Sequence, residues 1–176
     1  MNLSKRKNAI IKMLQENPGM GKTAVMKTIF MLQQVKHMDL GCEFSIYTYG
    51  PYNADVMEDI DELVSDGLLT SSAYSYKDYI GYTLSATDSG EEAVSNLKDQ
   101  DAAALKEILD FVREKNAKEL ELYSTIIYIE DWYLKNKKAN SVSAIVKKVH
   151  EIKPHFSEET IQNAYTCLSA ASFLHQ

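Results

Sequence analysis

The sequence predicts a mainly α fold with a small β-hairpin or sheet, in a chain of 176 residues that is 45% apolar and holds 7 Gly and 3 Pro. Apolar residues recur at helical spacing over most of the chain. One Tyr-rich stretch within 68–85 is instead bounded by turn residues, as in a hairpin. Cys42 and Cys167 form no C-x-x-C pair, so we expect a core that needs neither a disulfide nor a metal.

The first half of the chain alternates helices with extended segments. The helices show apolar residues three and four apart and end near Gly or Pro. The stretch after the second helix alternates with period two and stops at the turn pair Gly50-Pro51, which predicts a strand. The predicted elements are a helix over 5–16, a helix over 22–38, a strand over 43–49, a helix from the Asn53 cap to Asp66, and the hairpin.

The second half of the chain is predicted to be helical throughout. Thr87 is placed as the N-cap of a helix that passes Leu97. Helical hairpins follow over 102–115, 118–136, 141–152 and 157–174. The change from a mixed to a purely helical pattern near Leu97 predicts two parts: residues 1–97, and a C-terminal helical bundle over 98–176 that packs on the first part or on a second copy.

The order helix, helix, extended segment, helix and hairpin is that of a winged-helix module, so residues 1–97 are predicted to be winged-helix-like. The end of the hairpin, YTLSATDSGE over residues 82–91, resembles a signature with which many bacterial winged-helix regulators leave the wing. In that signature, Y-x-L-T-x-x-G, the chain passes from the second wing strand into its next helix. The resemblance supports the same transition here.

Three further stretches resemble the Panacea antitoxin domain and its uncharacterised prokaryotic relatives. They are a lysine-containing helix over 21–33, the Tyr-Gly-Pro-Tyr turn over 49–52, and a helix end with Gly-Leu over 63–68. The resemblance covers about residues 8–97. It implies a prokaryotic or phage protein that acts by binding other proteins, often beside a toxin gene, and it does not imply catalysis.

The net charge of −6 hides a strong asymmetry along the chain. Residues 1–38 sum to +6, residues 39–110 to −13 and residues 111–176 to +1. We expect the basic and acidic segments to lie against each other and largely cancel, because surface charge is usually compensated or solvated. If the basic segment were exposed, it would instead be the footprint of a nucleic-acid binder.

The working surface is predicted to bind a protein. Tyrosines supply large, rigid buried area, and carboxylates select a basic partner over an acidic one. The candidate protein-binding residues are Tyr49, Gly50, Pro51, Tyr52, Glu58, Glu62, Tyr76 and Tyr79. The function expected from them is that of a non-enzymatic regulatory binding protein, antitoxin-like in kind, with a partner of unknown identity.

The alternative is a winged-helix transcriptional regulator that binds DNA. The helix from Asn53 to Asp66 carries six acids and no Lys or Arg, which opposes docking in the major groove. DNA binding would therefore rest on the basic first helix, with help from Lys77 on the wing. The candidate nucleic-acid residues are Lys5, Arg6, Lys7 and Lys12.

Catalytic residues, a metal site and a cofactor are not expected, because the four His are scattered and the acidic pairs sit on an exposed helix face. Lys27 lies inside the most apolar helix. Either it is buried with its ammonium paired to an acid, or it snorkels from the helix edge. The apolar residues around most of the helix over 118–136 predict a homodimer.

The chain is expected to be cytoplasmic and to make no membrane contact. Its apolar runs are short and broken by charges, and none approaches the roughly 18 residues needed to cross a bilayer. The first residues, MNLSKRKNAIIK, show no signal-peptide apolar region.

Overall fold

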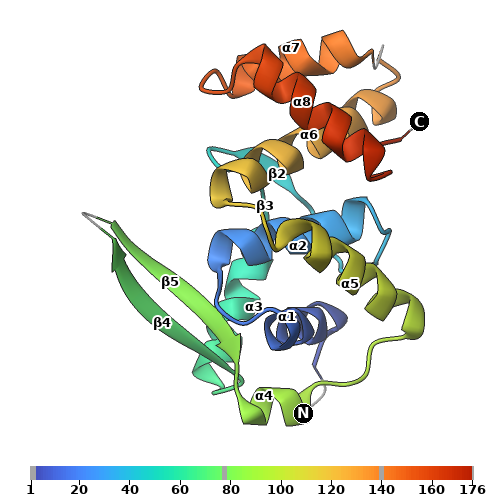
Figure 1. Ribbon diagram of the computed structural model, residues 1–176. Coiled ribbons are helices and arrows are strands. Elements are labelled where there is room, and N and C mark those ends of the chain that lie inside the picture. Colours follow the sequence, from blue (N-terminus) through green and yellow to red (C-terminus); the bar gives the residue numbers. More distant parts are fainter. Residues whose placement is uncertain (1–2, 77–78, 139–140, 176) are drawn as a thin grey trace. The chain divides into compact units, whose positions relative to one another are not determined.

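The computed structural model describes residues 3–76, 79–138 and 141–175 (Figure 1). It confirms a mainly α-helical chain with a small antiparallel sheet. The chain divides into two compact units, a first unit of residues 1–44 and 53–115 and a second unit of residues 45–52 and 116–176. The boundary at 115/116 differs from the expected one at 97/98, because the helix that follows residue 98 packs on the second helix of the first unit.

The first unit is a winged-helix-like module. Its elements are α1 (Lys5–Glu16), β1 (Met20–Gly21), α2 (Lys22–Gln34), α3 (Ala54–Ser65), β4 (Leu69–Tyr76), β5 (Tyr79–Ala86), α4 (Asp88–Ala93) and α5 (Asp99–Val112). The strands form one antiparallel sheet in the order β1-β5-β4. Apolar side chains of α1, α2 and α3 make the core, and Ile10, Phe30 and Ile60 are completely buried there.

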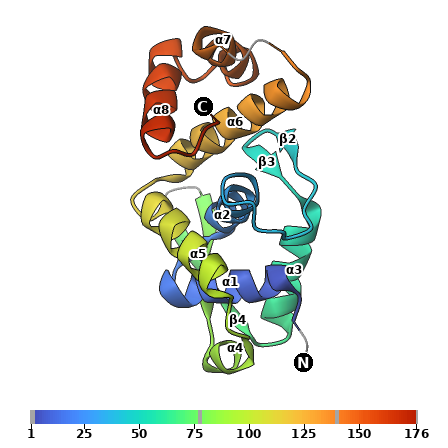
Figure 2. The same ribbon diagram turned by 90° about the vertical axis from the view of Figure 1, so that its right-hand side faces the viewer.

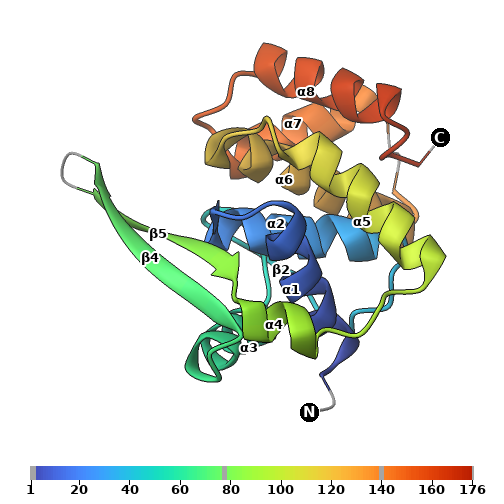
Figure 3. The same cartoon turned by 60° about the horizontal axis from the view of Figure 1, so that its bottom comes forward.

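The wing is a two-stranded arm that extends away from the helices of the first unit (Figures 1 and 3). β4 and β5 pair from Leu69↔Ala86 to Tyr76↔Tyr79. β1 pairs only with Thr83 and Leu84, at the base of the arm. Most of the wing therefore consists of two strands alone.

Capping residues fix the helix ends of the first unit as expected. The side chain of Asn53 accepts a hydrogen bond from the Val56 N–H at the start of α3. At the other end Gly67 adopts φ +72°, and the Leu68 N–H returns to the Leu63 carbonyl in a Schellman closure. Thr87 caps α4, but α4 ends at Ala93, before the expected passage of Leu97.

The second unit consists of β2 (Ser45–Tyr47), β3 (Gly50–Tyr52), α6 (Ala117–Lys135), α7 (Val142–Ile152) and α8 (Glu158–Ala170). α6 contacts β3, α7 and α8 (Figure 2). Many of its apolar residues, among them Leu120, Ile126 and Ile129, are buried, whereas Leu134 is 36% exposed. This packing accounts for much of the apolar circumference that predicted a homodimer. None of the helices in the described ranges has both the length and the apolar character of a membrane-spanning segment.

The strand expected over 43–49 is in fact one arm of a short hairpin. β2 pairs with β3 in the register Ser45↔Tyr52 to Tyr47↔Gly50, so Gly50 and Pro51 lie within a strand and the turn falls at Thr48 and Tyr49. Proline is tolerated there because the hairpin has only two strands and therefore only edge positions.

Candidate functional site

Two tyrosines stand out of the β2–β3 hairpin, which we call the tyrosine turn (residues 47–52). Tyr47 is 61% exposed and Tyr49 is 69% exposed. The ring of Tyr52, which is half-buried, lies 5.2 Å from that of Tyr47 at an interplanar angle of 48°. The turn thus presents aromatic area to the solvent, and two of its rings support each other.

A buried lysine holds the backbone of the tyrosine turn. Lys153, only 2% exposed, donates from Nζ to the carbonyl oxygens of Tyr47, at 3.2 Å, and of Thr48. The same ammonium forms an ion pair of 2.9 Å with Glu121 Oε1 on α6. His155 Nε2 lies 3.3 Å from that oxygen. Lys153 therefore connects the end of α7, α6 and the turn through a single charged group.

Glu121 has charge contacts but an incomplete set of hydrogen bonds. Its Oε1 is buried, and among the described residues it has no aligned hydrogen-bond donor, although Lys153 and His155 both approach it. A buried carboxylate is tolerated when an opposite charge compensates for its lost hydration. The carboxylate and the lysine therefore depend on each other.

Gly50 lies where the tyrosine turn packs closely against α6. It adopts φ +89°, which side chains rarely accept, and a Cβ there would lie 3.1 Å from Thr125 Oγ1 and 3.3 Å from the Glu121 carbonyl. Gly50 and Pro51 are both buried. They are therefore not themselves open to a partner, because β3 packs directly on α6. They position the tyrosines instead.

The acidic face of α3 is largely neutralised by basic residues within the first unit. Arg6 is hydrogen-bonded to Asp59, Lys7 to Glu62, and Lys22 to Asp61 at 2.7 Å. This confirms that the basic and acidic segments of the sequence lie against each other.

The charges of this face also set the pKa of the basic groups. Burial acts to lower the pKa of Arg6, but the hydrogen bond and the charge of Asp59 outweigh it and raise that pKa. The hydrogen bond that Lys7 donates to Glu62 raises the pKa of Lys7. Both side chains are therefore fixed cations that are already paired.

The candidate nucleic-acid residues are therefore engaged within the protein for the most part. Besides Arg6 and Lys7, Lys5 forms an ion pair of 2.9 Å with Asp101, and Lys12 donates to Gln15. Lys77 lies outside the described residues. Less positive charge remains on α1 for phosphate than the sequence suggests.

The remaining candidate residues all lie in the first unit. Glu58 is exposed on α3 in the first unit. Tyr76 and Tyr79 pair with each other at the end of the wing, and their side chains lie outside the described part of the structure. Lys27 is buried, with 3% of its surface exposed.

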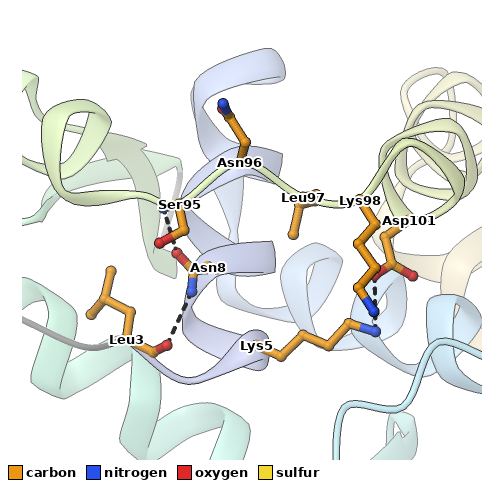
Figure 4. A pocket seen from close by; sticks show the side chains of 8 residues that line it. All are labelled: Leu3, Lys5, Asn8, Ser95, Asn96, Leu97, Lys98 and Asp101. Atoms are coloured by element: carbon orange, nitrogen blue, oxygen red, sulfur yellow. Dashed lines mark hydrogen bonds and ion pairs between the residues drawn. The ribbon is translucent and has the colours of Figure 1, made fainter.

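A cleft of about 270 Å³ lies beside the start of α1 (Figure 4). Asn8 donates to the Leu3 carbonyl at 3.1 Å and accepts from the Ser95 N–H at 2.9 Å, and Lys5 pairs with Asp101. These groups bind each other and tie the α4–α5 connection to α1, so we assign the cleft a structural role. Over the described ranges, no group of three or more His, Cys, Asp or Glu is placed to hold a metal ion.

Lys153 and Glu121 were missed by the sequence reasoning. Neither residue was among the candidates: Lys153 stands between two predicted helices, and Glu121 lies in the helix predicted over 118–136. The available signal was a charged residue inside a helix whose neighbours are apolar on most sides. That signal gives no partner, since the groups that meet here are 32 and about 105 residues apart in the chain.

The fold and the site define a mainly α-helical protein with a winged-helix-like module and an exposed tyrosine turn. No family model matches the chain. The chain is similar to the "Uncharacterized protein YwgA" of Bacillus subtilis strain 168, with 26% identity over 110 residues. The match spans 62% of this chain and 65%, less than two thirds, of the relative's length. The resemblance to the Panacea antitoxin domain therefore stays a prediction.

Proposed function

We propose that the protein is a non-enzymatic regulatory binding protein that acts through protein–protein contacts, in the manner of an antitoxin. The observation that carries this proposal is the tyrosine turn, in which Tyr47 and Tyr49 are largely exposed on a backbone that Lys153 and Gly50 hold in place. The Tyr-Gly-Pro-Tyr segment is also one of the stretches that resemble the Panacea domain.

The physical argument is the low entropic cost of docking on such a turn. A tyrosine has few rotatable bonds, buries a large area and keeps a hydroxyl for a partner or for water. A backbone already fixed by a buried ion pair loses little further freedom on binding. Tyr49, Tyr47 and Tyr52 are therefore the proposed anchors, with Gly50 and Pro51 as their support.

Charge has a smaller part in this proposal than the sequence suggested. Glu62 is paired with Lys7, so its carboxylate is less available to steer a basic partner. Glu58, exposed on α3, keeps that role. The partner is expected to be bound mainly by aromatic burial, with a modest dependence of the association rate on salt.

The experiment uses the purified product of the neighbouring gene as the binding partner. Tyr47→Ser/Tyr49→Ser is expected to weaken binding in titration calorimetry by about 30-fold or more, the effect of losing a hot spot of about 2 kcal/mol. Tyr74→Ser/Tyr82→Ser, which removes two exposed tyrosines of the wing, is the matched control. Equal affinities for the wild type and the Tyr47/Tyr49 variant, with both folded, would contradict the proposed surface.

The DNA-binding alternative is tested on the same preparation. In a filter-binding assay on genomic fragments at low salt, we expect no sub-micromolar complex, because Lys5, Arg6 and Lys7 are paired with acids. Tight binding that falls steeply with salt, and that Lys12→Gln weakens, would overturn the proposal in favour of a transcriptional regulator.

A further inference from the structure

The outer edge of the wing is a free strand edge. Among the residues that the structure describes, β4 is the last strand of the sheet order β1-β5-β4, so it has a strand partner on one side only. Residues 71–75 are all exposed, and the arm extends away from the helices of the first unit (Figure 3). An edge of this kind presents a row of backbone N–H and C=O groups that another strand can bind.

The pairing of β4 with β5 determines which backbone groups face outward. The Thr87 N–H donates to the Leu68 carbonyl, so Leu68 and the even-numbered residues after it are hydrogen-bonded to β5. The odd-numbered residues then direct their N–H and C=O groups away from β5. Ser71, Ala73 and Ser75 thus form the open edge.

This edge lacks the features that usually prevent strand addition. Exposed edges are commonly protected by lysine, by proline, by a bulge or by a covering element. Residues 69–76 read Leu-Thr-Ser-Ser-Ala-Tyr-Ser-Tyr, without a charge or a proline, and they pair with β5 without a bulge. The side chains next to the open edge groups are Ser and Ala, which allow a close approach.

We propose that the β4 edges of two copies of this chain pair antiparallel about a two-fold axis, which joins their wings into one continuous sheet. The proposed register places Ala73 opposite Ala73 of the second copy and Ser71 opposite Ser75. Both are hydrogen-bonded pairs, since all these residues face outward. Between these pairs, Ser72 lies opposite Tyr74 of the second copy. The serine side chain is small and therefore leaves room for the tyrosine ring.

A second copy fits this edge better than a charged partner segment does. The chain carries a net charge of −6, so most contacts between two copies would bring like charges together. Pairing through the uncharged stretch of β4 avoids this repulsion, because no charged residue of 69–76 lies opposite another. A basic or acidic peptide would gain no ion pair from the same stretch. The side chains of the two strands also match in size, because small residues, Ser and Ala, lie opposite small residues of the second copy.

The exposed side chains of β5 strengthen the argument. Ile80 and Tyr82, 62% and 52% exposed, lie on the same face as Ala73, because they alternate with Gly81 and pair with Ser75 and Ala73. In the joined sheet these apolar residues of both copies would flank a central strip of Ser and Ala.

Proline at the open edge tests the proposal. Ala73→Pro removes an N–H that points away from β5, so the pairing of β4 with β5 is kept while the outer edge is blocked. Over about 1 to 300 µM, light scattering is expected to show a dimer for the wild type and for the control Ala73→Ser, and a monomer for Ala73→Pro. A monomeric wild type, or a dimeric Ala73→Pro variant with native circular dichroism, would overturn the proposal.

Cysteine cross-linking tests the register even if the proline variant does not fold. Ala73→Cys places two thiols opposite each other with Cα atoms about 5.5 Å apart, within reach of a disulfide. Ser75→Cys, on the same face of the same strand, places them about 14 Å apart. Mild oxidation is expected to link the first variant alone; equal linking of both, or of neither, overturns the register.

Two further outcomes separate this inference from the proposed function. Tyr47→Ser/Tyr49→Ser is expected to remain dimeric, because the wing is unchanged. If instead the wild type is a monomer and Ala73→Pro loses the neighbouring gene product, the edge accepts a strand of that partner, and the pairing of two copies is refuted.

Discussion

The ammonium of Lys153 lies 2.9 Å from the carboxylate of Glu121, and both side chains are buried, with 3% and 8% of their surface exposed. Removing one member of such a pair leaves the other charge without water and without a counter-ion. Lys153 also donates to two carbonyl oxygens of the tyrosine turn. The stability of the second unit and the geometry of its exposed tyrosines therefore depend on the same group.

Lys153→Met is expected to destabilise the second unit by about 3 to 5 kcal/mol, the usual cost of an uncompensated buried charge. The measurement is urea unfolding followed by fluorescence of Trp132, the one tryptophan of the chain, which lies on α6. The double variant Lys153→Met/Glu121→Gln is expected to recover most of the stability that Lys153→Met loses, since neither residue then carries an unpaired charge. Lys148→Met, which breaks an exposed ion pair with Glu151, is the control and should leave the midpoint unchanged.

Gly50→Ala tests the close approach of β3 to α6. Alanine is unfavourable at this position for two reasons, the positive φ and a Cβ 3.1 Å from Thr125 Oγ1. We expect the free energy of unfolding to fall by about 2 to 4 kcal/mol. Gly41→Ala is the matched control, because Gly41 has φ +67° with no atom within 4 Å of the added Cβ. Its free energy of unfolding should fall by only about 1 to 2 kcal/mol, the cost of a positive φ for a residue with a Cβ. Equal losses for the two variants would show that the contact with α6 is unimportant.

Gly90→Ala tests whether close packing requires a glycine at the last position of the segment that resembles the wing signature. A Cβ on Gly90 would lie 2.1 Å from the carbonyl oxygen of Leu68, a backbone atom that cannot turn aside. Alanine favours helices, yet we expect a loss of about 2 to 3 kcal/mol, because the overlap outweighs that preference. Gly67→Ala, with φ +72° and open space around it, should cost about 1 to 2 kcal/mol. Thermal unfolding by circular dichroism compares the two, and a neutral Gly90→Ala would contradict the close packing.

Local signals in the sequence were sufficient for the elements of the first unit. The helix predicted over 5–16 is α1, and Asn53, Gly67 and Thr87 cap the ends that they were expected to cap. Each of these predictions uses residues within one or two turns of each other, where backbone hydrogen bonding decides the outcome. The wing is equally local, since β4 ends at Tyr76 and β5 begins at Tyr79, close to it in the chain.

The candidate site could be predicted only in part, because its geometry depends on distant residues. The sequence marked the turn over residues 49–52, but nothing local shows that α6 covers Gly50 and Pro51. The boundary at residue 97 was displaced for the same reason, as the contact of α5 with α2 joins segments far apart in the chain. Hydrophobic periodicity shows that a helix has a buried face but does not identify the element that covers it.

A second buried carboxylate on α6 predicts a pH dependence of stability. Glu130 is 1% exposed, and its Oε2 accepts the His175 N–H at 3.1 Å near the end of the chain. Burial raises the pKa of Glu130, and this hydrogen bond offsets the rise only in part. The folded protein therefore holds the proton more tightly than the unfolded chain does. The stabilisation from this group is complete below the unfolded pKa, about 4.5, and is lost as the pH rises through the folded pKa.

Glu130→Gln is expected to raise the unfolding midpoint at pH 7 and to leave it unchanged near pH 4. Glutamine keeps an oxygen that accepts the His175 N–H but carries no charge that must be desolvated, and near pH 4 the wild-type carboxyl is neutral as well. Urea unfolding followed by Trp132 fluorescence at the two pH values measures the difference, with Glu159→Gln on the exposed start of α8 as the control. If Glu130→Gln changes stability by the same amount at both pH values, the change comes from packing and the assigned ionisation of Glu130 is wrong.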